Sequence, residues 1–203
     1  MKDAFRTLAT SASAKLVRQR SRFIALLEPI TSVDAVHSRL SQIRRVYHDA
    51  SHCCSAFRLV ADPAPLQASD DDGEPTGSAG APILLQLEGA RLENVLAVVV
   101  RYFGGVKLGV GGLARAYSDV IATALASASI VERALAIELV VRFPLEANAG
   151  VMGAIYHHEA KILDIRYDTE GQAIVTVAPS RVEAFCRSVT EGTGARAQVE
   201  VTS

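Results

Sequence analysis

The sequence is short of the residues that build disulfide frameworks and metal sites. It has three cysteines, of which Cys53 and Cys54 are adjacent and Cys186 stands alone, so it offers neither a disulfide framework nor a CxxC metal pair. Tryptophan is absent, and no apolar run approaches the roughly 20 residues of a membrane span. The start, MKDAFRTLATSASA, lacks a hydrophobic signal segment. These absences predict a globular protein of the cytoplasm with no membrane contact.

An excess of charge of one sign is lacking too. The net charge is -1, with 14 Lys+Arg and 12 Asp+Glu in residues 1–130 and 7 and 10 in residues 131–203. Neither part is basic enough to indicate a nucleic-acid binder by its total charge. The length of 203 residues allows one large domain or two small ones. A claim of nucleic-acid binding therefore depends on local patterns.

Positive charge gathers near the N-terminus. In AKLVRQRSRFIALL, Arg18, Arg20 and Arg22 alternate, and on a single strand their side chains would leave the same face. Ser32 is expected to cap the next helix, with Arg44 and Arg45 on its polar side. Two interpretations stay open, an exposed sheet face with solvated charges and a surface that contacts phosphates.

A His/Cys group, His48, His52, Cys53 and Cys54, precedes the predicted strand HCCSAFRLV. Such a group suggests a metal site or a nucleophile. A second ligand pair at zinc spacing is missing, and adjacent side chains on a strand point to opposite faces. We therefore interpret the group as core cysteine with a hydrogen-bonded histidine.

The acidic stretch DDDGEPTGSAGAP has two interpretations. Asp71, Asp72 and Glu74 are able to supply oxygen ligands for magnesium, although their spacing does not fit a calcium loop. Alternatively, the stretch is a turn whose carboxylates pair with nearby arginines, and Ser78 caps the helix AGAPILLQLEG. The second interpretation is the favoured one.

A glycine-rich loop, FGGVKLGVGG, follows an apolar run that predicts a strand covered on both faces. The loop leads into the helix LARAYSDVIATALASA, and the free amides of a helix N-terminus favour anions. Gly109 and Gly111 match a dinucleotide fingerprint formally, but they lie too far beyond Tyr102 for its tight turn, and no Gly-Lys-Ser/Thr is present. A mononucleotide site, a contact with backbone phosphates or a partner, and a structural turn remain as alternatives.

The segment beyond residue 130 has clear periodicity. Alternating apolar residues predict strands at 137–143, 163–167, 172–178 and 196–201, with helices over 145–159 and after Ser180, which is expected to cap the second helix. The order strand, helix, strand, strand, helix, strand is the ferredoxin-like arrangement. We predict an α+β protein with domains at residues 1–130 and 131–203.

The stretches DDGEPTGSAGAPIL and NVLAVVVRYFGGVKLGVGGLARAY, with SRFIA and HCCSAFR upstream, closely resemble the YigZ/IMPACT family, and the resemblance extends over the whole chain. Thr76, Ser78 and Cys53 depart mildly from the family pattern. The resemblance implies an N-terminal IMPACT domain similar to domain IV of elongation factor G and to a ribosomal-protein fold. It implies a C-terminal ferredoxin-like domain similar to domain V of that factor.

The resemblance also implies a role in translation. Eukaryotic relatives are tied to translational control through a partner protein, and RNA or ribosome binding is the usual inference for bacterial ones. Our first hypothesis is a non-enzymatic regulatory protein that binds RNA, the ribosome or a ribosome-associated partner. The alternatives are a magnesium-dependent nucleotide enzyme or small-phosphate-binding protein that uses the 104–112 loop, and a protein-docking module. Only the nucleotide alternative calls for a cofactor, magnesium with nucleotide.

No catalytic residue and no metal ligand is assigned under the first hypothesis. The residues expected to contact nucleic acid or phosphate are Arg18, Arg20, Arg22, Arg44, Arg45, Arg101, Lys107 and Arg115. The residues expected to form the signature loops are Asp71, Asp72, Gly73, Glu74, Pro75, Gly77, Gly80, Tyr102, Gly104, Gly105, Gly109, Gly111 and Gly112.

Overall fold

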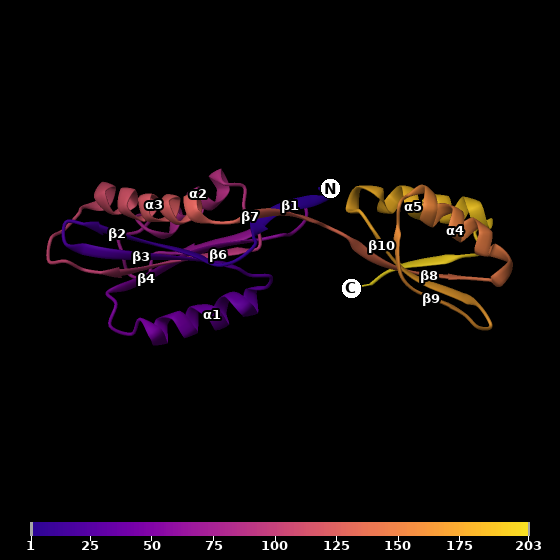
Figure 1. The fold of residues 1–203 in the computed structure, drawn as a ribbon, viewed down its shortest axis with the longest axis horizontal. Coiled ribbons are helices and arrows are strands. Elements are labelled where there is room, and N and C mark those ends of the chain that lie inside the picture. Colours follow the sequence, from indigo (N-terminus) through magenta and orange to yellow (C-terminus); the bar gives the residue numbers. More distant parts are fainter. Residues whose placement is uncertain (1, 203) are drawn as a thin grey trace. The chain divides into compact units, whose positions relative to one another are not determined.

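The computed structural model describes residues 2–202, which form two compact α+β units (Figure 1). The first unit runs from Phe5 to Arg133, and the second joins the segment from Ala134 onward to the first few residues, up to Ala4. The sequence did not suggest that the N-terminus belongs to the second unit. Asp3 in this N-terminal segment accepts hydrogen bonds at its carboxylate from the backbone amide and the hydroxyl of Ser180.

A five-stranded antiparallel sheet forms the centre of the first unit. The order is β2 (Ala12–Arg18), β3 (Ser21–Pro29), β6 (Val95–Tyr102), β4 (His52–Leu59) and β5 (Leu66–Asp70). Residues 95–101 of the central strand β6 are buried, as the apolar run predicted. Branched side chains suit such a strand because both of its faces are covered.

Helices cover both faces of this sheet (Figure 1). α1 (Val33–Val46) lies on one face, and α2 (Gly80–Gly89) and α3 (Val110–Ser127) lie on the other. The predicted cap of α1 is confirmed, since the Ser32 hydroxyl accepts a hydrogen bond from the Ala35 amide at 3.2 Å. Neighbouring residues on β3 show the two cores, because Phe23 packs towards α3 and Ile24 packs towards α1.

Three strands of the first unit were not predicted. β1 (Ala4–Leu8) pairs with β7 (Ile130–Ala134) in a two-stranded sheet. β5 is an edge strand whose five residues are all exposed, so it carries no apolar alternation by which to recognise it. Its pairing with β4 brings the acidic stretch to one end of the sheet.

The second unit has the predicted ferredoxin-like order of elements, and its antiparallel sheet runs β11-β8-β10-β9. The elements are β8 (Ile137–Phe143), a 3-10 turn (Leu145–Ala147) with α4 (Asn148–His157), β9 (Lys161–Tyr167), β10 (Gly171–Val177), a 3-10 turn (Pro179–Arg181) with α5 (Val182–Thr193), and β11 (Gln198–Val201). The expectation that Ser180 caps the last helix is wrong, because a 3-10 turn precedes α5 and the Ser180 hydroxyl donates to Asp3. None of the helices between residues 2 and 202 is long and apolar enough to cross a membrane.

Candidate functional site

The two signature loops of the first unit meet in a pocket of about 390 Å³ at one end of the sheet. We call it the loop-end pocket. Four segments enclose it: the start of β4, the acidic loop, the end of β6 and the glycine-rich loop with the first turn of α3. The lining residues are His52, Glu74, Pro75, Arg101, Phe103, Lys107, Leu108, Gly109, Val110 and Leu113.

A buried ion pair forms the floor of the loop-end pocket. Arg101 donates from Nη1 to Glu74 Oε1 at 2.6 Å, and the two side chains are only 5% and 3% exposed. The Tyr117 hydroxyl donates to the same oxygen at 2.7 Å. Burial, followed by the neighbouring Cys54, raises the pKa of Tyr117, so its phenol stays protonated. The pair fastens the acidic loop to the central strand and to α3.

A second carboxylate of the loop, that of Asp71, caps α2. Its two oxygens accept hydrogen bonds from the amides of Gly77, Ala79 and Gly80 at 2.8–2.9 Å. Burial raises the pKa of Asp71, but these amide bonds outweigh it and leave the pKa below its usual value. The predicted Ser78 cap is therefore wrong, and the Ser78 hydroxyl is buried with no hydrogen-bond partner among residues 2–202.

The third carboxylate, that of Asp72, ties the loop to α1 and β4. It accepts from Arg44 Nη2 at 2.9 Å and from the backbone amide of Cys53 at 2.6 Å. His52 Nδ1 lies 2.9 Å from the Asp72 carbonyl oxygen. A carbonyl only accepts, so Nδ1 carries the proton in this contact. The other ring nitrogen, Nε2, lies 3.9 Å from Glu74 Oε2. The interpretation of His52 as a hydrogen-bonded histidine is confirmed.

The magnesium hypothesis for Asp71, Asp72 and Glu74 loses its geometric basis. Each carboxylate faces a different partner: backbone amides, Arg44 or Arg101. Among residues 2–202 no group of three or more His, Cys, Asp or Glu side chains is arranged to hold a metal ion.

The adjacent cysteines are core residues, as interpreted from the sequence. Cys53 and Cys54 are both buried, and the Cys54 thiol lies 3.0 Å from the Asp71 carbonyl oxygen and 3.3 Å from the Tyr117 hydroxyl. Burial raises the pKa of Cys53 to about 11 and that of Cys54 to about 12. Neither thiol therefore supplies a nucleophilic thiolate near neutral pH.

The glycine-rich loop opens α3 without a side-chain cap. Gly109 is the N-cap, with φ 70°, and makes no capping hydrogen bond with a side chain. The first helical amide with an internal partner is that of Leu113, which donates to the Gly109 carbonyl. In the described part of the chain the amides of residues 110–112 have no acceptor. The first turn of α3 therefore presents free N–H groups beside the pocket.

Gly104 has a different role. A Cβ at this position would lie 2.0 Å from the Arg20 carbonyl carbon and 2.3 Å from the Ser21 amide nitrogen. Its amide donates to the Ser21 hydroxyl, which Arg101 Nη2 also contacts at 3.3 Å. Only glycine allows the loop to approach the β2–β3 turn this closely.

The predicted arginine stripe is not on one strand. Arg18 ends β2, Arg20 is in the turn with φ 68°, and Arg22 is on β3, so the three side chains do not share a face. Arg18 pairs with Asp119 at 3.0 Å, and the Arg22 guanidinium lies 4.2 Å from the centroid of the Tyr102 ring. The β2–β3 turn was not recognisable from the sequence. Its two residues with positive φ are Gln19 and Arg20, whereas hairpin turns of this kind usually contain glycine or asparagine.

The other expected phosphate contacts divide into two groups. Arg44 pairs with Asp72 and also lies 3.5 Å from Asp70, and Arg101 is buried in its pair with Glu74, so neither is a free surface cation. Of the eight residues expected to contact phosphate, five have no carboxylate partner among residues 2–202, and we call them the loop-end cations: Arg20, Arg22, Arg45, Lys107 and Arg115. Arg20 is in the β2–β3 turn and Arg22 is on β3 opposite Tyr102. Arg45 is in the last turn of α1, Lys107 lines the loop-end pocket, and Arg115 is in the second turn of α3.

Three residues of the site were missed in the sequence: Ser21, Phe103 and Tyr117. Phe103 is 50% exposed beside the pocket, directly after the central strand and before two glycines, and this position was a usable signal. Ser21 and Tyr117 gave none, because their contacts with Arg101 and Glu74 join residues 80 and 43 positions apart.

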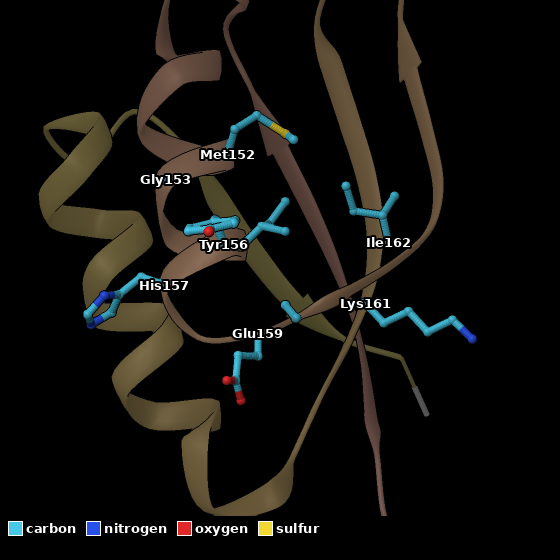
Figure 2. Close-up of a pocket in the computed structure, with 9 residues that line it drawn as sticks. Met152, Gly153, Tyr156, His157, Glu159, Lys161 and Ile162 are labelled. Carbon is cyan, nitrogen blue, oxygen red and sulfur yellow. The ribbon is translucent and has the colours of Figure 1, made fainter.

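A more open cavity of about 990 Å³ lies in the second unit between the end of α4 and β9 (Figure 2). Met152, Tyr156 and Ile162 give it an apolar lining, and the Glu159 and Lys161 side chains extend away from it in Figure 2. None of the residues expected to contact phosphate or to form the signature loops lines this cavity. The loop-end pocket is the stronger candidate site.

Fold and site together define a two-unit α+β protein in which two signature loops enclose one small pocket and a ferredoxin-like unit follows. The model of the Impact N-terminal domain matches residues 19–125. The chain is 31% identical to IMPACT family member YvyE of Bacillus subtilis over 98% of this chain and 92% of that protein. It is 32% identical to IMPACT family member YigZ of Escherichia coli over 82% of both chains. The chain therefore belongs to the IMPACT family.

A solved structure agrees with this assignment over the full length. A crystal structure described only as that of a hypothetical protein covers 100% of this chain and 99% of its own, with a TM-score of 0.71 and 26% sequence identity. A second protein, whose description states no activity, therefore has a similar fold over the full length of the chain.

Proposed function

We propose that this IMPACT family protein is a translation-associated factor that binds RNA, alone or within the ribosome, without catalysing a reaction. The observation that carries the proposal is the group of loop-end cations. Exposed Arg and Lys side chains without carboxylate partners attract nucleic-acid phosphates and release counterions when they bind. Family membership supports a role in translation, and the cations support RNA as the ligand.

The charge balance at this end of the sheet supports the proposal further. Three arginines pair with four nearby carboxylates: Arg44 with both Asp70 and Asp72, Arg101 with Glu74, and Arg18 with Asp119. Asp71 keeps its charge and is held by backbone amides. The five loop-end cations therefore outnumber the two carboxylate charges that these arginines leave uncompensated. A phosphate backbone would meet a locally positive surface although the whole chain has a net charge of -1.

The enzyme alternative is the weaker one because the buried groups of the site are poor reactants. Cys54 and Tyr117 have pKa values raised by burial, and the Glu74 carboxylate already accepts two hydrogen bonds. A general base or nucleophile needs a pKa near the working pH and a free lone pair. These side chains are better suited to holding the loops in place.

A substitution series tests the proposal. The triple variant Arg20→Gln, Arg22→Gln and Arg45→Gln removes three loop-end cations, all exposed. Binding of the full chain to a structured RNA should weaken. The slope of log affinity against log salt should fall by roughly two to three, since each lost phosphate contact removes about 0.7–0.9.

The matched control is the triple variant Arg6→Gln, Lys15→Gln and Arg91→Gln. These three cations are also exposed, and they lie on β1, in the middle of β2 and in the turn before β6. The control should keep both the affinity and the salt slope. Equal loss in the two triple variants, or no RNA binding at low salt by the unchanged protein, would overturn the proposal.

A protein-docking role is the second candidate, and exposed apolar side chains favour it. Phe103, Val106 and Val110 are 50%, 40% and 58% exposed around the glycine-rich loop. Co-sedimentation with ribosomes, with and without ribonuclease, separates the two candidates. Ribonuclease-resistant association that is lost in Val106→Ser but kept in the arginine triple variant would favour docking to a protein.

A further inference from the structure

The loop-end pocket combines donors for an anion with an apolar wall. The free amides of residues 110–112 point from the first turn of α3, where the helix dipole adds partial positive charge. Lys107 lines the pocket two residues before the N-cap. Gly109 and Gly111 leave this backbone uncovered, since a Cβ at Gly109 would meet nothing within 4 Å and one at Gly111 only the end of the Arg115 side chain.

An unsatisfied buried donor in the pocket is an independent sign of a ligand. Arg101 is 4% exposed and lines the pocket, and its Nε has no hydrogen-bond partner among residues 2–202. Its Nη1 and Nη2 are already engaged by Glu74 and Ser21. Buried polar groups of native proteins are normally hydrogen-bonded. An acceptor bound in the pocket would complete the hydrogen bonding of this guanidinium.

The opposite wall suits a flat ring. Phe103 is half exposed although it is a large aromatic side chain at the mouth of the pocket, and Val110 next to it is 58% exposed. The Arg101 guanidinium lies 5.6 Å from the centroid of the Phe103 ring and supports it from one side. Nucleobases stack on exposed aromatic rings of this kind.

Size narrows the choice of ligand. The volume of about 390 Å³ is at the lower end of the roughly 300–1,000 Å³ range of small-molecule pockets. Glu74 is the one carboxylate that lines the pocket, and its charge is compensated by Arg101. A single nucleotide fits this combination of size, anion donors and an exposed ring.

We propose that the loop-end pocket binds one nucleotide unit, with its phosphate on the α3 amides and Lys107 and its base against Phe103. The unit is either a free nucleoside monophosphate or the 5′-phosphorylated end of an RNA chain. The inference goes beyond the proposed surface binding of RNA, and Lys107 is the one side chain that both proposals use. Phe103 and the α3 amides carry the pocket proposal, whereas Arg20, Arg22 and Arg45 carry the surface proposal, so the two are testable separately.

Isothermal titration of the full chain with adenosine 5′-monophosphate tests the proposal. AMP should bind, and adenosine and inorganic phosphate should each bind at least about tenfold more weakly, because each lacks half of the contacts. Lys107→Gln and Phe103→Ala should each weaken AMP binding on the order of tenfold. Both side chains are exposed, so the variants are expected to fold like the unchanged protein.

The matched controls are Lys15→Gln and Tyr156→Ala. Lys15 is exposed on β2, and Tyr156 is an 89% exposed aromatic residue in the second unit. Both controls should bind AMP unchanged, as should the Arg20, Arg22 and Arg45 triple variant. If the triple variant still binds AMP but no longer binds RNA, the AMP site and the RNA-binding surface are separate, and each proposal is tested independently of the other.

Oligouridine with a 5′-phosphate, compared with the same chain ending in a 5′-hydroxyl, distinguishes the sources. A preference for the phosphorylated chain that Lys107→Gln and Phe103→Ala abolish identifies an RNA end. AMP binding without such a preference identifies a free nucleotide, and either result supports the pocket. The proposal is overturned when 1 mM AMP and the phosphorylated chain both give no heat of binding, or when AMP binding is the same in all variants.

Discussion

Replacing Glu74 with glutamine would leave the Arg101 guanidinium buried without a counter-charge. Glu74 and Arg101 are 3% and 5% exposed at the side chain and lie 2.6 Å apart. Removal of one partner of such a pair costs about 3–5 kcal/mol, because the remaining charge stays desolvated. A domain of this size is stabilised by about 5–15 kcal/mol, so a large part of the stability of the first unit would be lost.

The double variant Glu74→Gln with Arg101→Met removes both charges and should lose less than the single variant. Replacement of a buried ion pair by uncharged side chains of similar volume is often close to neutral. Urea unfolding gives the free energies, and hydrogen exchange of the β6 peptide assigns the change to the first unit. The expected coupling energy is on the order of 2–3 kcal/mol.

The control for this experiment is the Arg18–Asp119 pair, whose side chains are 54% and 49% exposed. Asp119→Asn should cost less than about 1 kcal/mol, because solvent screens an exposed pair. The reasoning is refuted when Glu74→Gln lowers the free energy of unfolding no more than Asp119→Asn does. It is also refuted when the double variant loses at least as much stability as the single variants Glu74→Gln and Arg101→Met lose together.

Three further predictions concern the same end of the first unit. Gly104→Ala should lower the free energy of unfolding by at least about 2 kcal/mol. Gly111→Ala should leave the free energy of unfolding unchanged or raise it by up to about 1 kcal/mol. A similar effect of the two substitutions would contradict the close approach of Gly104 to the β2–β3 turn. Asp71→Asn should destabilise at pH 7, and the difference should shrink as the pH falls from about 4 towards the lowered pKa of Asp71, because a carboxylate with a lowered pKa stabilises only while ionised; a difference that does not shrink as the pH falls would rule out this cause. At pH 8, Cys53 and Cys54 should react with a disulfide reagent on the order of a hundredfold more slowly in the native than in the urea-unfolded protein, since less than about 1% is thiolate; rapid native labelling of either thiol, read by mass spectrometry, would exclude their burial.

Elements with a regular local pattern were predictable from the sequence. The central strand β6 followed from its apolar run, the start of α1 from Ser32, and the ferredoxin-like order of the second unit from its alternating strands. In each case the signal is local in the sequence: a continuous apolar run, a capping residue directly before its helix, or alternation with the period of a strand. The family resemblance, which the comparisons confirm, located the signature loops.

The contacts within the site were not predictable in the same way. The carboxylates of the acidic stretch were expected to pair with nearby arginines, and this is confirmed, but the sequence did not indicate that the partner of Glu74 is Arg101, 27 positions away, or that the pair is buried. Asp71 caps α2 across a loop from nine positions before Gly80, whereas capping patterns predict a side chain next to the helix. Such pairs follow from the tertiary fold, and no local periodicity records them.

One hydroxyl, that of Ser21, has a consequence for how the protein folds. It accepts hydrogen bonds from Arg101 and Gly104, which come 80 and 83 positions later in the chain. At a synthesis rate of about 5–20 residues per second, Arg101 and Gly104 are therefore made several seconds after Ser21. The residues that pair in the β2–β3 hairpin are close in the sequence, so the hairpin is able to form first. The site depends on contacts between residues far apart in the sequence, so it forms later. Until the first turn of α3 has been made, a nascent chain of this family has a hairpin but no pocket.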